Sequence, residues 1–147
     1  MARVLYGVSP VGLGHASRAV AMGSELKARG AEVTFATGGP AVPFLRSYGF
    51  DVREIVSEPN PTVWRGRNMF SSLWYLRYWR GHRASKARMA RLLDETRPDV
   101  IVGDEEFSVL ALARERGAKG IMISDELELG FARTFLSRSK TRGLPAK

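Results

Sequence analysis

The sequence predicts an α/β fold built on a doubly wound, mostly parallel sheet, and three observations support this prediction. Short runs rich in β-branched and aromatic residues alternate with segments of helical pattern. A glycine follows each of the clearest helical segments, where a left-handed C-terminal cap is expected. The repeated order of strand, helix, glycine and strand produces right-handed βαβ units. We therefore expect a Rossmann-like sheet of five or slightly more strands, in the order 3-2-1-4-5.

Five segments have the composition of strands, and three helices fit between them. The strands are expected at Arg3–Val8, Glu32–Thr37, Asp51–Val56, Asp99–Asp104 and Gly120–Ser124. The first, fourth and fifth are apolar enough to be buried on both faces of the sheet. The helices are expected at His15–Arg29, Ala41–Tyr48 and Glu105–Arg116, each closed by the glycine that follows (Gly30, Gly49 and Gly117).

A longer connection separates the third and fourth strands. Ser57–Asn68 contains two prolines and is expected to be a loop. Met69–Glu95 has a helical pattern in which Gly81 is a candidate break. Residues 1–128 are thus expected to form one domain, and residues 129–147 a tail without a clear strand.

Composition narrows the class of protein. The 147 residues correspond to one domain, and the absence of cysteine excludes disulfides and thiolate metal sites. No run of apolar residues is long enough to cross a membrane. We expect a soluble, cytoplasmic protein without a metal site.

The net charge of +8 is concentrated in one segment. Residues 64–91 carry eight cationic side chains and no acidic one, whereas the rest of the chain has 15 basic and 15 acidic residues. This asymmetry indicates a local anionic partner rather than a generally basic protein.

The stretch GVSPVGLGHASRA (residues 7–19) leads from the first strand through a glycine-containing turn into a helix that begins with a histidine. A nucleotide-binding Walker A loop is excluded because Leu13 stands where that motif requires lysine. A dinucleotide fingerprint is disfavoured because Ser17 occupies its third glycine position. The helix N-terminus attracts anions and favours a neutral His15 that can accept a proton. Alternatively, His15 is an ordinary helix residue.

Topology favours the catalytic interpretation of His15. In the expected strand order, the loop after the first strand faces the loop after the fourth, which carries Asp104, Glu105 and Glu106. A carboxylate there could orient the imidazole and stabilise its protonated form. The alternative role for Asp104 is to cap the helix that follows it. Asp125, after the fifth strand, is a weaker candidate.

The chain resembles the N-terminal domain of GT-B fold glycosyltransferases. The resemblance rests on the segments GVSPVGLGHASRAVAMGSELKARGAEVTFATGG, FLRSYGFDV and RPDVIVGDEEFSVLALARERGAKGIMIS, and covers about residues 3–125. It is similar both to the peptidoglycan N-acetylglucosaminyltransferase and to UDP-sugar transferases of small acceptors. The resemblance implies an inverting sugar transferase whose acceptor binds to this half, with a lipid-linked hydroxyl compound as one candidate acceptor.

The resemblance also implies roles for particular residues. His15 corresponds to the general base, and Asp104 to the aspartate that assists it. The glycine turn is linked to acceptor or diphosphate binding. The candidates for this contact are Gly12, Leu13, Gly14, Arg18, Glu105 and Asp125.

GT-B enzymes hold the nucleotide sugar mainly in a second domain, and the chain contains no donor motif of that kind. We therefore expect this half to bind no cofactor itself. A UDP-sugar is expected on a donor-binding domain beyond the 129–147 tail, or on a separate subunit. The chain alone is not expected to be a complete enzyme.

The cationic segment is also rich in aromatic residues. It could lie on an anionic membrane surface, line an acceptor cleft, bind nucleic acid, or simply pack through Met69, Leu73 and Leu76. Two other functions for the whole chain remain open, namely a non-catalytic anion-binding module and a nucleic-acid binder. The candidate membrane or acceptor contacts are Trp64, Arg65, Trp74, Arg77, Tyr78, Trp79 and Arg80.

Overall fold

The structure is a computed structural model that describes residues 1–56, 63–64, 67–68 and 71–124. The described strands are β1 (Arg3–Val8), β2 (Glu32–Thr37), β3 (Asp51–Glu54), β4 (Val63–Trp64), β5 (Arg67–Asn68), β6 (Val100–Asp104) and β7 (Gly120–Ile123). The helices are α1 (Gly14–Ala28), α2 (Ala41–Ser47), α3 (Ser71–Thr96) and α4 (Phe107–Glu115).

Five strands form one parallel sheet in the order β3-β2-β1-β6-β7. This confirms the predicted order, with β6 and β7 as its fourth and fifth strands. Three connecting helices end as predicted, since Gly30, Gly49 and Gly117 have positive φ angles of 81°, 74° and 64°. The segments β4 and β5 pair with each other in a short antiparallel hairpin.

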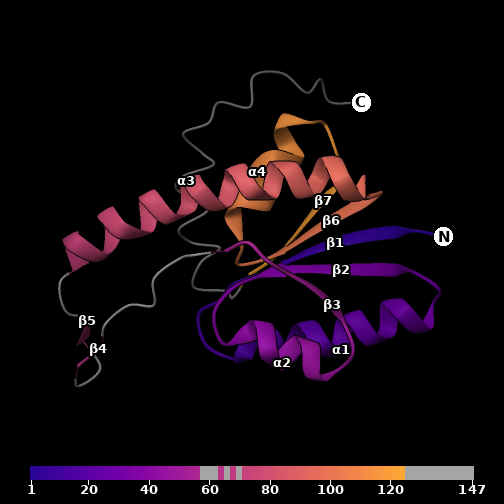
Figure 1. The fold of residues 1–147 in the computed structure, drawn as a ribbon, viewed down its shortest axis with the longest axis horizontal. Coiled ribbons are helices and arrows are strands. Elements are labelled where there is room, and N and C mark those ends of the chain that lie inside the picture. The colour runs from indigo at the N-terminus through magenta and orange to yellow at the C-terminus, as the bar shows by residue number, and fades with distance from the viewer. Residues whose placement is uncertain (57–62, 65–66, 69–70, 125–147) are drawn as a thin grey trace, which may run out of the picture.

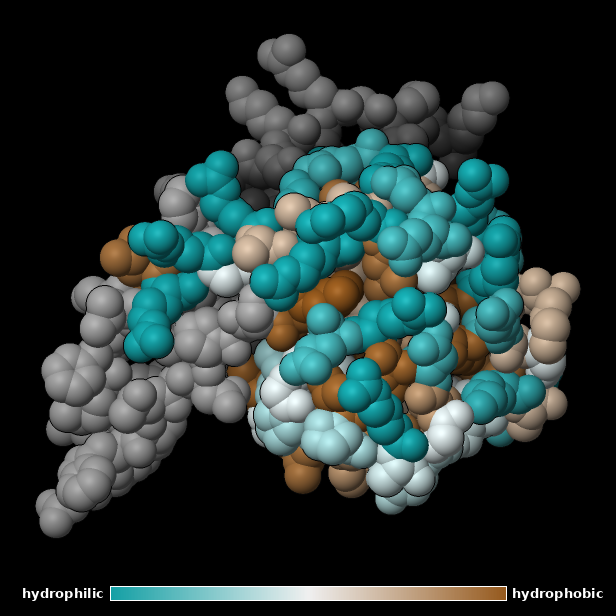
Figure 2. All heavy atoms as spheres, in the orientation of Figure 1, coloured by the Kyte–Doolittle hydropathy of each residue, from teal (hydrophilic) through white to brown (hydrophobic). Residues whose placement is uncertain are grey.

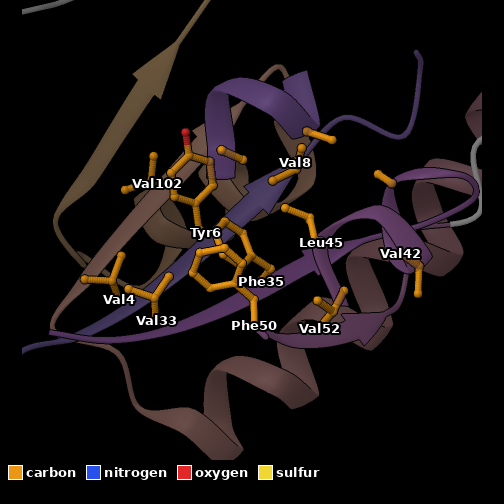
Figure 3. Packing of buried hydrophobic residues seen from close by; sticks show 13 residues of the cluster. Val4, Tyr6, Val8, Val33, Phe35, Val42, Leu45, Phe50, Val52 and Val102 are labelled. Atoms are coloured by element: carbon orange, nitrogen blue, oxygen red, sulfur yellow. The ribbon is translucent and has the colours of Figure 1, made fainter. Parts of the chain in front are cut away.

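Helices cover both faces of the sheet: α1 and α2 lie on one side, and α3 and α4 on the other (Figure 1). Side chains of β1 alternate between these two layers. Val4, Tyr6 and Val8 pack in the core under α1 and α2, and Leu5 packs in the core under α3 and α4. Figure 3 shows the first core, in which the ring of Phe35 lies 5.2 Å from that of Tyr6.

The structure corrects three expectations about the elements. The fifth strand, β7, is not buried on both faces, because Ile121 is 53% exposed. The helix α3 continues through Gly81 without a break. The side chain of Leu76 is 56% exposed and does not pack in the core, whereas the side chains of Met69 and Leu73 lie outside the described residues.

The second half of α3 packs against the body of the protein, and its first half extends past the sheet (Figure 1). Met89, Leu92 and Leu93 in the second half are buried with residues of α4. Within the described ranges, no helix combines the length and the apolar character needed to span a bilayer.

Candidate functional site

The candidate site lies at the edge of the sheet where β1 and β6 end. Val8 and Asp104 are the last residues of these strands and are partners in the parallel register. The backbone N–H of Ser9 donates to the carbonyl oxygen of Asp104 over 2.9 Å, so the two strand ends are tied together. The chain then turns through Gly12, whose φ of 74° suits glycine, and α1 begins at Gly14.

This turn brings His15 to Asp104, although 89 positions separate them in the sequence. The distance from His15 Nδ1 to Asp104 Oδ1 is 3.0 Å. Asp104 is completely buried, and the side chain of His15 is 16% exposed. The predicted pairing of these two residues is therefore present in the structure, while their catalytic role stays a prediction.

Arg18 binds the same carboxylate from one turn further along α1. Its Nε donates to Asp104 Oδ2 over 2.9 Å, and its Nη2 donates to Oδ1 over 2.5 Å. Two charge-assisted hydrogen bonds to one carboxylate offset much of the cost of burying its charge. The structure thus places the guanidinium of Arg18 on Asp104, and its predicted contact with a phosphate stays a prediction.

Tyr6 is a member of the site that the sequence analysis missed. Its hydroxyl donates to Asp104 Oδ2 over 3.4 Å from beneath α1. Burial raises the pKa of the Tyr6 phenol, and the negative charge of Asp104 raises it further. The hydroxyl therefore stays protonated and donates. The sequence could have indicated Tyr6 through its position in β1, because residues two apart in a strand point to the same layer, and Tyr6 shares the layer of Val8.

Glu105 lies on the other side of the imidazole. Its Oε2 is 2.9 Å from His15 Nε2, and its side chain is 15% exposed. The backbone of Glu105 has a φ of 51°, which is unusual for a residue with a side chain and costs of order 1–3 kcal/mol. Its N–H donates to the carbonyl oxygen of Ile123 at the end of β7 over 3.1 Å. Both ring nitrogens of His15 thus face carboxylates.

The next acidic residue, Glu106, caps α4. Its buried side chain accepts hydrogen bonds from the N–H groups of Ser108 and Val109, over 3.3 Å and 2.8 Å, and from the Ser108 hydroxyl. The alternative role considered for Asp104, the cap of this helix, is therefore wrong. The helix starts at Phe107 because Glu105 is in a left-handed conformation and Glu106 is extended.

The glycine turn presents an open surface. A Cβ atom added at Gly12 or Gly14 would meet no other atom within 4 Å, and Leu13 is exposed. The N-cap residue of α1, Leu13, makes no side-chain hydrogen bond to the first turn of this helix. Backbone N–H groups at such a helix end suit an anionic ligand, and the predicted contact of this turn with an acceptor or phosphate stays a prediction.

Two of the other predicted contacts, Arg77 and Arg80, do not join this site. Arg77 and Arg80 are exposed on α3, which covers the opposite face of the sheet from α1. Asp125 and Arg65 lie outside the described residues, as do the side chains of Trp64, Trp74, Tyr78 and Trp79.

A hollow of about 320 Å³, lined in part by Arg97 and Arg116, lies at the amino-terminal ends of β6 and β7 and contains no residue of the His15 site. Over the described ranges, no group of three or more His, Cys, Asp or Glu side chains forms a metal site.

The fold and the site define a class of protein: a Rossmann-like α/β domain with a candidate acid–base pair at the carboxyl ends of its central strands. Known proteins make this more specific. A family model described as glycosyl transferase family 1 matches residues 2–130. The chain therefore belongs to glycosyl transferase family 1.

Solved structures of glycosyltransferases have the same fold. The glycotransferase of kitacinnamycin has a TM-score of 0.68 and 18% identity, covering 95% of this chain and 36% of its own. The glycosyltransferase VinC, solved in complex with dTDP, has a TM-score of 0.64 and 15% identity, covering 97% of this chain and 39% of its own. MurG from Acinetobacter baumannii has a TM-score of 0.60 and 16% identity, covering 100% of this chain and 44% of its own. The chain thus spans less than half the length of these proteins. A comparison with curated proteins found no match.

Proposed function

We propose that this chain is the acceptor-binding half of an inverting glycosyltransferase, with His15 as the general base. The observation that carries the proposal is the 3.0 Å contact between His15 Nδ1 and the buried carboxylate of Asp104. Nδ1 faces both Asp104 Oδ1 and, at 3.1 Å, the Nη2 of Arg18. In the proposed tautomer the carboxylate holds the hydrogen on Nδ1 and leaves Nε2 as the nitrogen that accepts a proton. Family membership supports the transfer of a sugar.

In the proposed reaction, Nε2 removes the proton of an acceptor hydroxyl while the acceptor oxygen attacks the anomeric carbon of the sugar. A new C–O bond forms on one face of that carbon. The bond to the nucleoside diphosphate breaks on the other face, and the diphosphate leaves with the electron pair. The configuration at the anomeric carbon is inverted. Asp104 stabilises the imidazolium that results.

The donor in this proposal binds to another domain or to a separate subunit. Support comes from the lengths of the similar structures, of which this chain covers 36% to 44% in the three cases described above. We propose a nucleoside diphosphate sugar as the donor. The resemblance in sequence favours a UDP-sugar, and the dTDP complex of VinC makes a dTDP-sugar the alternative to test.

Substitution of His15 in protein supplied with its donor-binding half tests this proposal. We expect His15→Ala to lower kcat by about 10²–10⁴-fold, the range that a general base contributes. Asp104→Asn is expected to lower kcat in the same range, because it disturbs the hydrogen-bonding pattern of the ring. His82→Gln is the matched control, since His82 is the chain's other histidine and lies on α3, across the sheet.

Two results would contradict the proposal. Unchanged turnover in His15→Ala would show that His15 is not the general base. A product with retained anomeric configuration, determined by NMR, would contradict the inverting mechanism. If the chain instead bound an acceptor and no donor half gave any transfer, the non-catalytic binding module would be the better description.

We also propose that the protein works at the anionic, cytoplasmic face of a membrane, where a lipid-linked acceptor would be found. The support is the cationic surface of α3, where Arg77, Arg80, Arg83, Arg88 and Arg91 are exposed. In Figure 2, hydrophilic side chains gather over the described part of this helix. Anionic lipids attract such clusters of arginine.

A further inference from the structure

In the structure, the nitrogen that the proposed mechanism needs is already occupied. Glu105 Oε2 lies 2.9 Å from His15 Nε2, on the side of the ring opposite Asp104. A carboxylate can only accept a hydrogen bond, so Nε2 carries a hydrogen in this arrangement. A general base needs a lone pair at the same atom. The structure therefore describes a state in which His15 cannot accept the proton of an acceptor.

The backbone around Glu105 is anchored on both sides. Asp104 is held through its carboxylate by Arg18 and through its carbonyl oxygen by Ser9. Glu106 is buried under the first turn of α4, where it accepts backbone hydrogen bonds. The N–H of Glu105 itself is bound to Ile123. A change at this position is therefore confined to the side chain of Glu105.

That side chain is free to leave. It is partly exposed, and among the described residues its carboxylate contacts only His15. The three neighbouring charged groups are otherwise bound together, because the guanidinium of Arg18 and the imidazole of His15 both contact Asp104. Rotation of the Glu105 side chain toward solvent would expose Nε2 and leave the His15–Asp104–Arg18 group intact.

We propose that Glu105 is a gate that holds His15 Nε2 until the acceptor displaces it. The inference rests on the proposed role of His15 as the base. In the closed state the ring donates through Nδ1 to Asp104, beside the Nη2 of Arg18, and through Nε2 to Glu105. When the gate opens, the proton on Nε2 passes to solvent water, and the acceptor hydroxyl takes the place of the carboxylate. The left-handed backbone of Glu105 aims the carboxylate back at the ring, which gives this strained conformation a function.

The gate can be tested without knowing the acceptor, by using diethyl pyrocarbonate as the probe. This reagent modifies an imidazole nitrogen that carries a lone pair, and mass spectrometry of peptides measures the rate at each histidine. We expect Glu105→Ala to raise the modification rate of His15 by about three- to tenfold, as expected if the gate is closed most of the time. Glu105→Gln, which keeps the size of the side chain but not its charge, should give an intermediate rate.

Two controls accompany this measurement. His82 is an internal reference, and its rate should be the same in all variants. Glu25→Ala removes an exposed carboxylate from the far end of α1, where it pairs with Arg29, and should leave the rate at His15 unchanged. Alanine keeps the preference of Glu105 against a positive φ, so the backbone is no freer in the variant. Circular dichroism checks that each variant is folded.

The ring nitrogens give a second readout. In ¹⁵N NMR spectra of the 147-residue chain at neutral pH, Glu105→Ala should shift the His15 Nε2 resonance and leave Nδ1 nearly unchanged, since Asp104 still binds Nδ1. An unchanged rate of modification and an unchanged Nε2 resonance would overturn the gate. Loss of turnover in His15→Ala with no effect of Glu105→Ala on either readout would overturn only the gate. Full turnover in His15→Ala would overturn the proposed function itself.

Discussion

At the scale of single residues, Asp104 organises the site. It is completely buried, and its carboxylate accepts hydrogen bonds from Tyr6, His15 and Arg18. A buried carboxylate is stable only where such donors compensate for the loss of water. The same donors fix its orientation, so the atom that faces His15 is set before any acceptor binds. Tyr6 reaches the site only through Asp104, whereas the Nη2 of Arg18 also lies 3.1 Å from His15 Nδ1.

Arg18→Met tests how strongly the guanidinium stabilises the buried carboxylate of Asp104. We expect it to lower the free energy of unfolding by roughly 1–3 kcal/mol, because the buried carboxylate of Asp104 loses two charge-assisted donors. The range lies below that of a fully buried pair because the side chain of Arg18 is 35% exposed. Urea denaturation of the chain measures the change.

Arg29→Met is the matched control for this substitution, because Arg29 is the C-cap residue of the same helix. Arg29 forms an exposed pair with Glu25, four residues earlier, and such pairs contribute only about 0.3–0.5 kcal/mol. Equal losses of stability in the two variants would show that the Arg18–Asp104 contact is no stronger than a surface pair. Adding Asp104→Asn to Arg18→Met should restore part of the stability, since no uncompensated charge remains.

Residue-level prediction succeeded where topology alone decides the outcome. His15 and Asp104 follow neighbouring strands, so the strand order was sufficient to bring them together. The partners of Arg18 depend on the rotation of α1 about its axis, which the pattern of apolar residues does not specify closely. The contact of Glu105 with the ring depends on a φ of 51° at a residue that normally avoids it.

At the scale of elements, two glycines let α4 approach the sheet. Gly7 in β1 and Gly103 in β6 are partners in the register. A Cβ atom at Gly7 would lie 2.8 Å from Val109 Cγ1 and 3.2 Å from Glu106 Oε2. At Gly103 it would lie 2.9 Å from the carbonyl oxygen of Glu106. These contacts set the position of the first turn of α4, and thereby of the loop that carries Glu105.

Gly7→Ala should therefore destabilise the protein. The added methyl group meets packed atoms of α4, and overpacking of this kind costs about 1–3 kcal/mol. Gly14→Ala is the matched control, because a Cβ atom there meets nothing within 4 Å. Its stability should be unchanged, or higher by less than about 1 kcal/mol. Thermal or urea unfolding compares the two variants, and equal stability would mean that α4 can move aside at no cost.

Element-level prediction worked best for the regular βαβ units. Alternating patterns and terminal glycines located all five strands of the large sheet and the helices α1, α2 and α4. The boundary errors have local causes, such as the extended Glu106 that delays the start of α4 until Phe107. Exposure of β7 was not foreseeable from its apolar sequence, because burial at the edge of a sheet depends on what lies beside the edge.

At the scale of the whole molecule, the cationic helix and the candidate site lie on opposite sides of the sheet. The cationic helix α3 covers one face, while His15 and Arg18 belong to α1 on the other. The net charge of +8 arises in residues 64–91, most of which belong to α3. The cationic surface of α3 thus lies apart from His15, so the two can be altered independently.

Binding to lipid vesicles tests the proposed membrane surface. We expect the chain to co-sediment with vesicles that contain phosphatidylglycerol at low salt, and not with pure phosphatidylcholine. The double substitution Arg77→Gln and Arg80→Gln should weaken binding by roughly thirtyfold, since each arginine near such a surface contributes about 1 kcal/mol. The control, Arg29→Gln with Arg53→Gln, removes the same charge from exposed positions at the C-cap of α1 and on β3, and should have a smaller effect. Equal losses in the two double variants would indicate attraction to net charge alone. Tighter binding to an RNA oligonucleotide than to any vesicle would assign α3 to nucleic acid.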